Sequence, residues 1–347
     1  MKTSTKYPTT TLTLTLAMIL LAACDNEVIA PYTVLSPTPA TDAAAEASQP
    51  ASAQSFGPET LAGASGQFSI GVLPIVPEAR PFQSAIWNAA RRWTEILRET
   101  ELPDVFILHG PKPDCHGINL DDIAGVVDDL VITVTVMRID GAGGILARGG
   151  PCWVRREGSL PFLGIMVLDA ADIQDLDAAE LTELFVHQTG HILGIGPLWG
   201  TFGRLQSPSL YSPGTDTHFN GPLAVAAFNA AGGRGYRGGK VPVENLMGLG
   251  FSDMHWRESV LGSELMTPVL RSDEANPLSA ITIQSLADLG YTVDTALADA
   301  FTLPSADAGA VPDEAERGRT IRLAGDLLTG PLFAFDPDGR VVQMLRR

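Results

Sequence analysis

The sequence FVHQTGHILGIGPLW, residues 185–199, carries two histidines, His187 and His191, four positions apart. Residues at i and i+4 of an α-helix lie one above the other on the same face, so imidazoles at this spacing can converge on one metal ion. The DAAE at residues 177–180 offers an N-cap Asp followed by a Glu three positions later, and Gly194 is placed to end the helix. Bare H-x-x-x-H spacing also occurs without a metal. The helix boundaries nevertheless favour a metal-binding pair.

The residue between these histidines is unusual for a hydrolytic metal site. In the motif H-E-x-x-H, the Glu accepts a proton from the zinc-bound water. Here that position is Gln188, whose amide can donate a hydrogen bond but cannot accept a proton near neutral pH. Glu183 points to another side of the helix, and we expect Glu258 and Glu264 to be structural. The sequence leaves open whether this is a natural pseudo-peptidase or an inactivated variant.

A third histidine, His255, opens HWRESVLGSELMTP at residues 255–268. The combination of H-x-x-x-H-x-x-G with a distant H-W-R-E-S and an E-L-M-T resembles the leishmanolysin-like family of metzincin zinc metallopeptidases, in particular its bacterial lipoprotein members. Segments such as HFNGPLAVAAFNAAGG and VPVENLMGLG support the resemblance, which covers residues 68–294. It implies an α+β metzincin-type domain with a mixed sheet, an active-site helix and a cleft between two lobes. By the same resemblance His187, His191 and His255 would bind Zn²⁺, and Met266 would form the Met-turn.

Other periodic segments complete the expected domain. We predict strands within residues 67–76, 128–139 and 160–170, and helices within residues 81–100 and 279–290. The resemblance further implies that the strand before the metal helix borders the cleft and pairs with an extended peptide. Backbone groups of residues 164–167 are therefore candidate substrate contacts, although an ordinary core strand explains that stretch equally well.

The N-terminal residues suggest export. Residues 1–23 combine a basic start with an apolar stretch too short to span a bilayer, and LAAC at residues 21–24 resembles the end of a lipoprotein signal at Cys24. An uncleaved anchor or a conventional secretory signal is the alternative. Residues 24–66 are rich in Ala, Pro, Ser and Thr, which predicts a flexible tether. The peptidase-like domain is expected at residues 67–298, and residues 299–347 form a C-terminal tail with a possible hairpin at Asp338.

Cysteine content and charge narrow the alternatives further. Besides Cys24, the chain contains only Cys115 and Cys152, and an even pair in an exported protein predicts a disulfide more readily than a zinc site. The net charge is -17, and no basic stretch interleaved with aromatic residues occurs. These features argue against nucleic acid as a partner.

We therefore expect a zinc-binding metalloendopeptidase-type protein of the bacterial cell envelope. It would be attached to a membrane through lipid on Cys24, with a peptide or protein as its substrate. Hydrolysis would be strongly impaired by Gln188, because general acid/base catalysis is worth about 10²- to 10⁴-fold. The alternative is a non-catalytic peptide-binding or adhesion lipoprotein on a peptidase scaffold. If only the base is missing, Gln188→Glu alone should raise hydrolysis by about 10²-fold or more.

Overall fold

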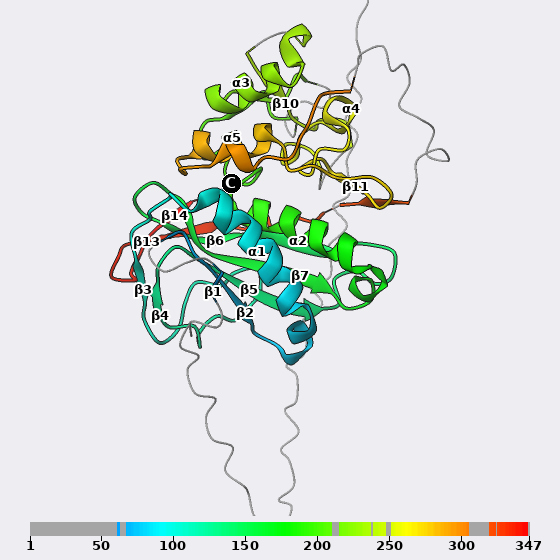
Figure 1. The fold of residues 1–347 in the computed structure, drawn as a ribbon. Coiled ribbons are helices and arrows are strands. Elements are labelled where there is room, and N and C mark those ends of the chain that lie inside the picture. The colour runs from blue at the N-terminus through cyan, green and yellow to red at the C-terminus, as the bar shows by residue number, and fades with distance from the viewer. Residues whose placement is uncertain are drawn as a thin grey trace, which may run out of the picture. The chain divides into compact units, whose positions relative to one another are not determined.

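The computed structural model describes residues 61–62, 67–209, 215–236, 239–247, 251–304, 319–323 and 325–345 (Figure 1). The predicted signal peptide, Cys24 and most of the predicted tether lie outside these residues. Within the predicted tether, Leu61–Ala62 forms a short strand, β1, that pairs with β2. Within the described ranges no helix combines the length and the apolarity needed to cross a membrane.

A seven-stranded mixed sheet forms one layer of the fold. Strands β2, β5 and β7 run parallel, and β6 is antiparallel to β7. On the other side of β6, β13 pairs with it in parallel and β14 closes an antiparallel hairpin. The order across the sheet is β1 (Leu61–Ala62), β2 (Ile70–Pro74), β5 (Leu130–Met137), β7 (Pro161–Asp169), β6 (Ala147–Arg155), β13 (Leu332–Phe335) and β14 (Val341–Leu345). The predicted α+β class with a mixed sheet is confirmed.

Two long helices cover one face of this sheet (Figure 1). They are α1 (Gln83–Leu97) and α2 (Ala178–Leu193), and they pack against each other as well as against the strands. Helix α2 begins at a capping box between Asp177 and Glu180, and it ends at Gly194 with φ 117°. A residue with a Cβ would be strained at that φ, which explains the abrupt end before Ile195.

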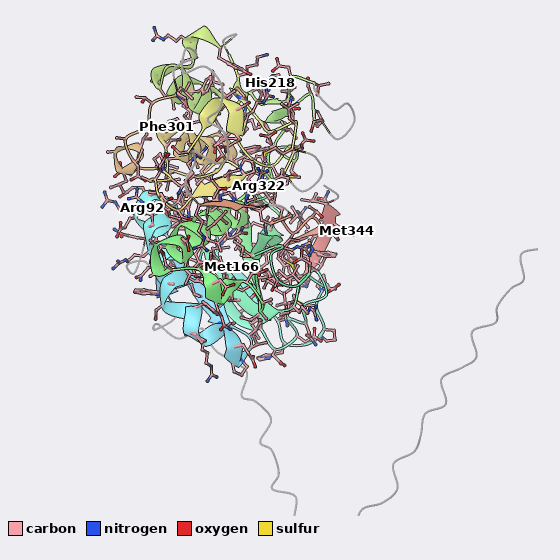
Figure 2. All side chains as sticks on the ribbon, turned by 90° about the vertical axis from the view of Figure 1, so that its right-hand side faces the viewer. Arg92, Met166, His218, Phe301, Arg322 and Met344 are labelled. Carbon is pink, nitrogen blue, oxygen red and sulfur yellow. A yellow bond between two sulfur atoms is a disulfide. The ribbon has the colours of Figure 1, made fainter. Side chains whose placement is uncertain are left out.

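The opposite face of the sheet packs on a smaller apolar cluster. That cluster includes the two-stranded sheet of β3 (Val105–Ile107) and β4 (Gly125–Val127), and the structure joins Cys115 to Cys152 of β6 by a disulfide. Because both faces are covered, every residue of β7 is buried. Met166 at its centre has no exposed surface, whereas Met344 on the outermost strand is 49% exposed (Figure 2).

Strand β7 is consequently not available to a substrate. Its backbone pairs with β5 on one side and with β6 on the other over residues 164–167. The expectation that these residues border the cleft and bind an extended peptide is therefore wrong. The neighbour of β7 in the sheet that contacts α2 is β6. Gly149 of β6 lies directly against Gln188 of α2.

The chain between α2 and residue 304 forms a second group of elements on the side of α2 away from the sheet (Figure 1). A cluster of Trp199, Phe219 and Trp256, with ring centroids 4.5–5.6 Å apart, forms part of its core. Helix α5 is capped by Ser279 and ends at Gly290, as expected from the sequence. The elements are β8 (Leu205–Gln206), β9 (His218–Phe219), α3 (Pro222–Ala230), β10 (Val241–Pro242), α4 (Glu258–Leu261), β11 (Val269–Arg271) and α5 (Ala280–Leu289).

The C-terminal residues pair with strands of both the second group of elements and the main sheet. Strand β12 (Thr320–Arg322) pairs with β11, and β13 then joins the main sheet beside β6. The predicted hairpin forms around Asp338, between β13 and β14. However, the described residues of 299–347 belong to the same compact unit as residues 67–298. The predicted division at residue 298 does not separate two structural units.

Candidate metal centre

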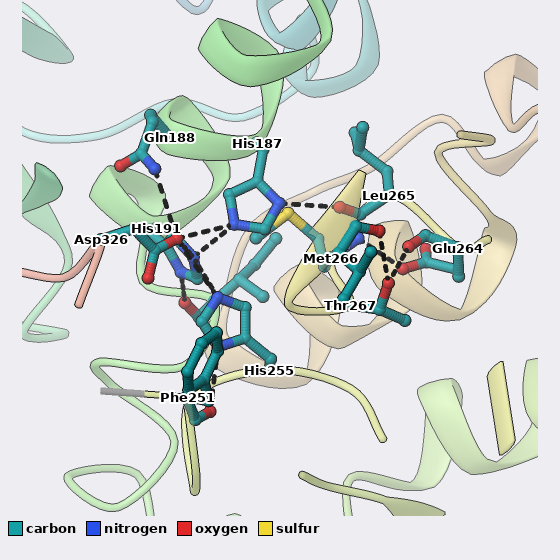
Figure 3. A network of polar contacts seen from close by, with 12 residues as sticks. His187, Gln188, His191, Phe251, His255, Glu264, Leu265, Met266, Thr267 and Asp326 are labelled. Carbon is teal, nitrogen blue, oxygen red and sulfur yellow. Dashed lines mark hydrogen bonds and ion pairs between the residues drawn. The ribbon is translucent and has the colours of Figure 1, made fainter. Parts of the chain in front are cut away.

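Three imidazoles converge at the C-terminal half of α2 (Figure 3). His187 and His191 lie one turn apart on α2, and His255 arrives from the loop before α4. The Nε2 atoms of His187 and His191 are 2.8 Å apart, and those of His191 and His255 are 3.2 Å apart. All three side chains are fully buried. The structure therefore brings together the three histidines that the sequence nominated as ligands.

The other ring nitrogen of each histidine faces a backbone carbonyl. Nδ1 of His187, His191 and His255 lies 2.7, 2.8 and 3.0 Å from the carbonyl oxygens of Leu265, Ile195 and Phe251. A carbonyl only accepts hydrogen bonds, so in a neutral ring Nδ1 carries the proton and Nε2 presents its lone pair. The tight turn at Gly194 places the carbonyl oxygen of Ile195 within hydrogen-bond distance of Nδ1 of His191. The three lone pairs consequently point into one small volume.

A fourth group, which the sequence analysis missed, completes this cluster. The Asp326 side chain is 2% exposed, and its Oδ2 lies 3.1, 3.4 and 3.3 Å from Nε2 of His187, His191 and His255. Asp326 lies between β12 and β13, 139 positions from His187. No motif or spacing marks it in the sequence. Only the return of the C-terminal segment to the sheet brings it to the histidines.

The separations within this group fit a tetrahedral metal ion. Ligands about 2.0–2.1 Å from a zinc ion at the centre of a tetrahedron are roughly 3.3–3.4 Å from one another. Five measured edges span 2.8–3.4 Å, and all four donor atoms lie within 4.8 Å of one another. The second carboxylate oxygen, Oδ1 of Asp326, is buried without a hydrogen-bond partner among the described residues. Three nitrogen lone pairs and a carboxylate so close together form a donor set that could hold a metal ion.

The pKa values of the clustered groups are shifted by burial and by their mutual contacts. Burial lowers the pKa of His191 to about 4, and the neighbouring His187 contributes to that decrease. Burial acts to lower the pKa of His255 as well, but Asp326 outweighs it and the pKa is raised. The pKa of Asp326 lies well below its ordinary value despite the opposing effect of burial, because of its contacts with the histidines, His255 foremost. The contacts with the three imidazoles therefore favour the ionised form of the Asp326 carboxylate.

Gln188 lies immediately beside this group. Its Nε2 is 3.3 Å from Oδ2 of Asp326 and donates to it, whereas its Oε1 is buried without a partner among the described residues. The orientation of the amide follows from chemistry, because a carboxylate can accept only from the NH₂ end. The other side of Gln188 contacts β6, where a Cβ on Gly149 would lie 2.5 Å from Oε1. Gln188 is therefore packed between β6 and Asp326.

Met266 and Glu264 support the cluster from the loop before β11. Met266 is fully buried, with its sulfur beside the ring of His187 in Figure 3, and a Cβ on Gly190 of α2 would lie 2.9 Å from that sulfur. Glu264 accepts the backbone N–H of Met266 at 2.7 Å and the hydroxyl of Ser279 at 2.7 Å. Glu264 therefore holds the loop in place, and its carboxylate does not enter the metal cluster.

The remaining acidic candidates lie elsewhere. Glu183 accepts a hydrogen bond from Asn276 at 2.6 Å, and Glu258 forms an ion pair with Arg271. A cavity of about 390 Å³ lies between α1, α2 and the loop around Leu278, but none of the clustered metal-ligand candidates lines it. The donor atoms suited to a metal lie in the buried cluster and not in that cavity.

Comparison with known proteins agrees with this geometry. The sequence profile of the leishmanolysin family matches residues 120–309, which is more than half of the chain. The matched region contains all three histidines and Met266, and it ends before Asp326. No protein with curated annotation matches the chain. A mixed α+β fold, a buried metal-ligand cluster on the predicted helix and this match together show that the chain belongs to the leishmanolysin family of metallopeptidases.

Proposed function

We propose that this protein binds one Zn²⁺ through His187, His191 and His255 and that it is a metalloendopeptidase-type protein with little activity. The observation that carries the proposal is the convergence of three Nε2 lone pairs, each fixed by a hydrogen bond from Nδ1 to a backbone carbonyl. Such outer hydrogen bonds orient imidazole ligands and set their tautomer. Soft and borderline divalent ions prefer this nitrogen-rich donor set, and zinc is the metal of the family.

The residues around the cluster explain why turnover should be slow. Bound zinc would polarise a peptide carbonyl and lower the pKa of a coordinated water. Gln188 holds the position from which a proton acceptor would act, but its amide can only donate toward the cluster. The absence of that base should reduce hydrolysis by about 10²- to 10⁴-fold. Within the described residues no carboxylate other than Asp326 lies in the group.

Metal analysis of the purified protein tests the zinc site. We expect close to one equivalent of zinc in the wild-type protein and a clear loss in His255→Ala. His109→Ala is the matched control, because His109 is exposed and lies outside the cluster. Less than about half an equivalent in the wild-type protein, or equal zinc in the His255 and His109 variants, would overturn the three-histidine site.

A second function is favoured by Gln188 itself. A protein that keeps zinc but lacks the base could retain peptides without cleaving them, as a binding or adhesion protein would. The two functions differ in turnover. Incubation of the zinc-loaded protein with unfolded protein substrates, followed by mass spectrometry, should yield cleavage products for a slow peptidase and only retained intact peptides for a binding protein.

We also propose that the protein is exported and attached to a membrane of the cell envelope through Cys24, which lies outside the described residues. The apolar stretch and the LAAC at residues 21–24 support this location. Mass spectrometry of the mature N-terminus should find a diacylglyceryl group on Cys24. A soluble protein with an unmodified terminus elsewhere would exclude the anchor. The same analysis would show whether the mature chain begins at residue 24, the predicted domain boundary.

A further inference from the structure

The strand beside the metal cluster is already paired along its outer edge. The N–H of Gly149 on β6 donates to the carbonyl of Asp326 at 2.8 Å, and the N–H of Leu328 donates back to Gly149 at 3.1 Å. Farther along, β13 continues the parallel pairing with β6 over residues 153–155. The same C-terminal segment therefore pairs with the edge of β6 beside the metal cluster and again at the end of the strand.

This edge is where an extended peptide would reach the metal. Peptides commonly bind by adding a strand to an exposed sheet edge, and β6 is the strand that contacts Gln188 of the metal helix. Strand β7 cannot serve, because both of its edges are used within the sheet. A peptide directed at the cluster along β6 would have to displace residues 326–335.

Two glycines of β6 leave room on the strand, Gly149 for Gln188 of α2 and Gly150 for Leu328 of the C-terminal segment. A Cβ on Gly149 would lie 2.5 Å from Oε1 of Gln188, and a Cβ on Gly150 would lie 3.1 Å from Cβ of Leu328. Leu328 is 6% exposed and belongs to the apolar cluster beneath the sheet. The segment is thus packed against β6 by its side chains as well as by its backbone.

Asp326 joins this edge of β6 to the histidine cluster. Its backbone carbonyl pairs with β6 while its Oδ2 lies 3.1–3.4 Å from all three imidazoles. A zinc site with four protein ligands has no open position, whereas a catalytic one has three and retains a position for water or substrate. The amide of Gln188 donates to the Asp326 oxygen, so it stabilises the carboxylate there.

We propose that residues 320–323 and 325–345 form a built-in inhibitory segment, in which Asp326 is the fourth metal ligand and the residues after it occupy the peptide-binding edge of β6. This inference rests on the proposed zinc site. The family match ends at residue 309, so the segment lies outside the matched region. Access to the metal then requires that the segment leave β6. A peptide and the segment compete for the same edge of β6.

The experiment measures access to the metal without relying on turnover. The protein is loaded with Co²⁺ in place of zinc, and acetohydroxamate, a small metal-directed ligand, is titrated while the visible spectrum is recorded. Wild-type protein should show the intense bands of four-coordinate Co²⁺ and little response to the probe. Asp326→Ala should bind the probe at least about tenfold more tightly, because apparent affinity scales with the fraction of open sites. Asp326→Asn, which preserves side-chain volume, should shift in the same direction.

The controls separate this inference from the proposed function. Asp338→Ala changes an exposed carboxylate of the same segment, outside the cluster, and should behave as wild type. Amide hydrogen exchange should accelerate on β6 near Gly149 in the two Asp326 variants and not in the Asp338 variant. If no variant binds metal, the proposed function fails. If all bind metal and the probe equally well, or if exchange on β6 does not change, the inhibitory segment is refuted while the zinc site stands.

Discussion

Replacing Gln188 by Glu tests the missing base, and the structure changes what this variant alone should do. A glutamate in the same rotamer would place a carboxylate oxygen about where Nε2 now lies, 3.3 Å from Oδ2 of Asp326. The present amide donates to that oxygen, and a second carboxylate would repel it. We therefore expect Gln188→Glu alone to recover less hydrolysis than Gln188→Glu combined with Asp326→Ala.

The magnitude follows from two terms. Two unit charges 3.3 Å apart repel by roughly 5 kcal/mol at an effective dielectric constant near 20, although a bound cation would reduce this figure. A repulsion of that size favours a proton shared between the two carboxylates, which leaves the new base only partly effective. Once Asp326 is removed, the base should contribute its usual factor of about 10²–10⁴. Asp326→Ala alone should change hydrolysis by less than about tenfold, because no proton acceptor is added.

The assay is kcat/KM on a broad panel of unfolded protein substrates, with zinc content verified for each variant. The two single variants and the double variant form a cycle, and the interaction energy between positions 188 and 326 is read from its non-additivity. Adding His255→Ala to the double variant should abolish the gain. If Gln188→Glu alone matched the double variant, Asp326 would not obstruct the site. A double variant that stays at the wild-type rate would show that another part of the peptidase machinery is absent.

Three further predictions concern the support of the site and the stability of the fold. Glu264→Ala should lower the free energy of unfolding in urea by about 2–4 kcal/mol, because it leaves several buried donors unpaired; an unchanged midpoint would contradict this role. Gly149→Ala should cost about 1–3 kcal/mol through its contact with Gln188, whereas Gly200→Ala, which meets no atom within 4 Å, is a control expected to retain the wild-type melting temperature. Burial raises the pKa of Asp129 from 3.8 to about 6, so the stability linked to its protonation is present below pH 3.8 and is lost as pH rises through about 6. Asp129→Asn should flatten the change in melting temperature over that pH interval. An unaltered profile of melting temperature against pH would refute the assignment.

Local features of the sequence were sufficient for the elements that carry the histidines. The start of α2 at Asp177, its end at Gly194 and the spacing of His187 and His191 depend on residues within a few positions of one another. Capping, glycine conformation and helical periodicity are short-range effects, so a single sequence reveals them. The more distant His255 could be nominated only because its motif resembles that of a known family.

The tertiary structure alone decided what lies opposite those histidines. Asp326 is 139 positions from His187, and its segment contains no motif that indicates a metal ligand. It reaches the cluster because strand β13 adds to β6, and a period-2 pattern specifies which face of a strand is buried but not which strand it will join. The same limit explains the mistaken role for residues 164–167, whose two neighbours in the sheet were not evident from their composition. Strand pairing joins residues far apart in the chain, and its selection depends on the packing of the whole sheet.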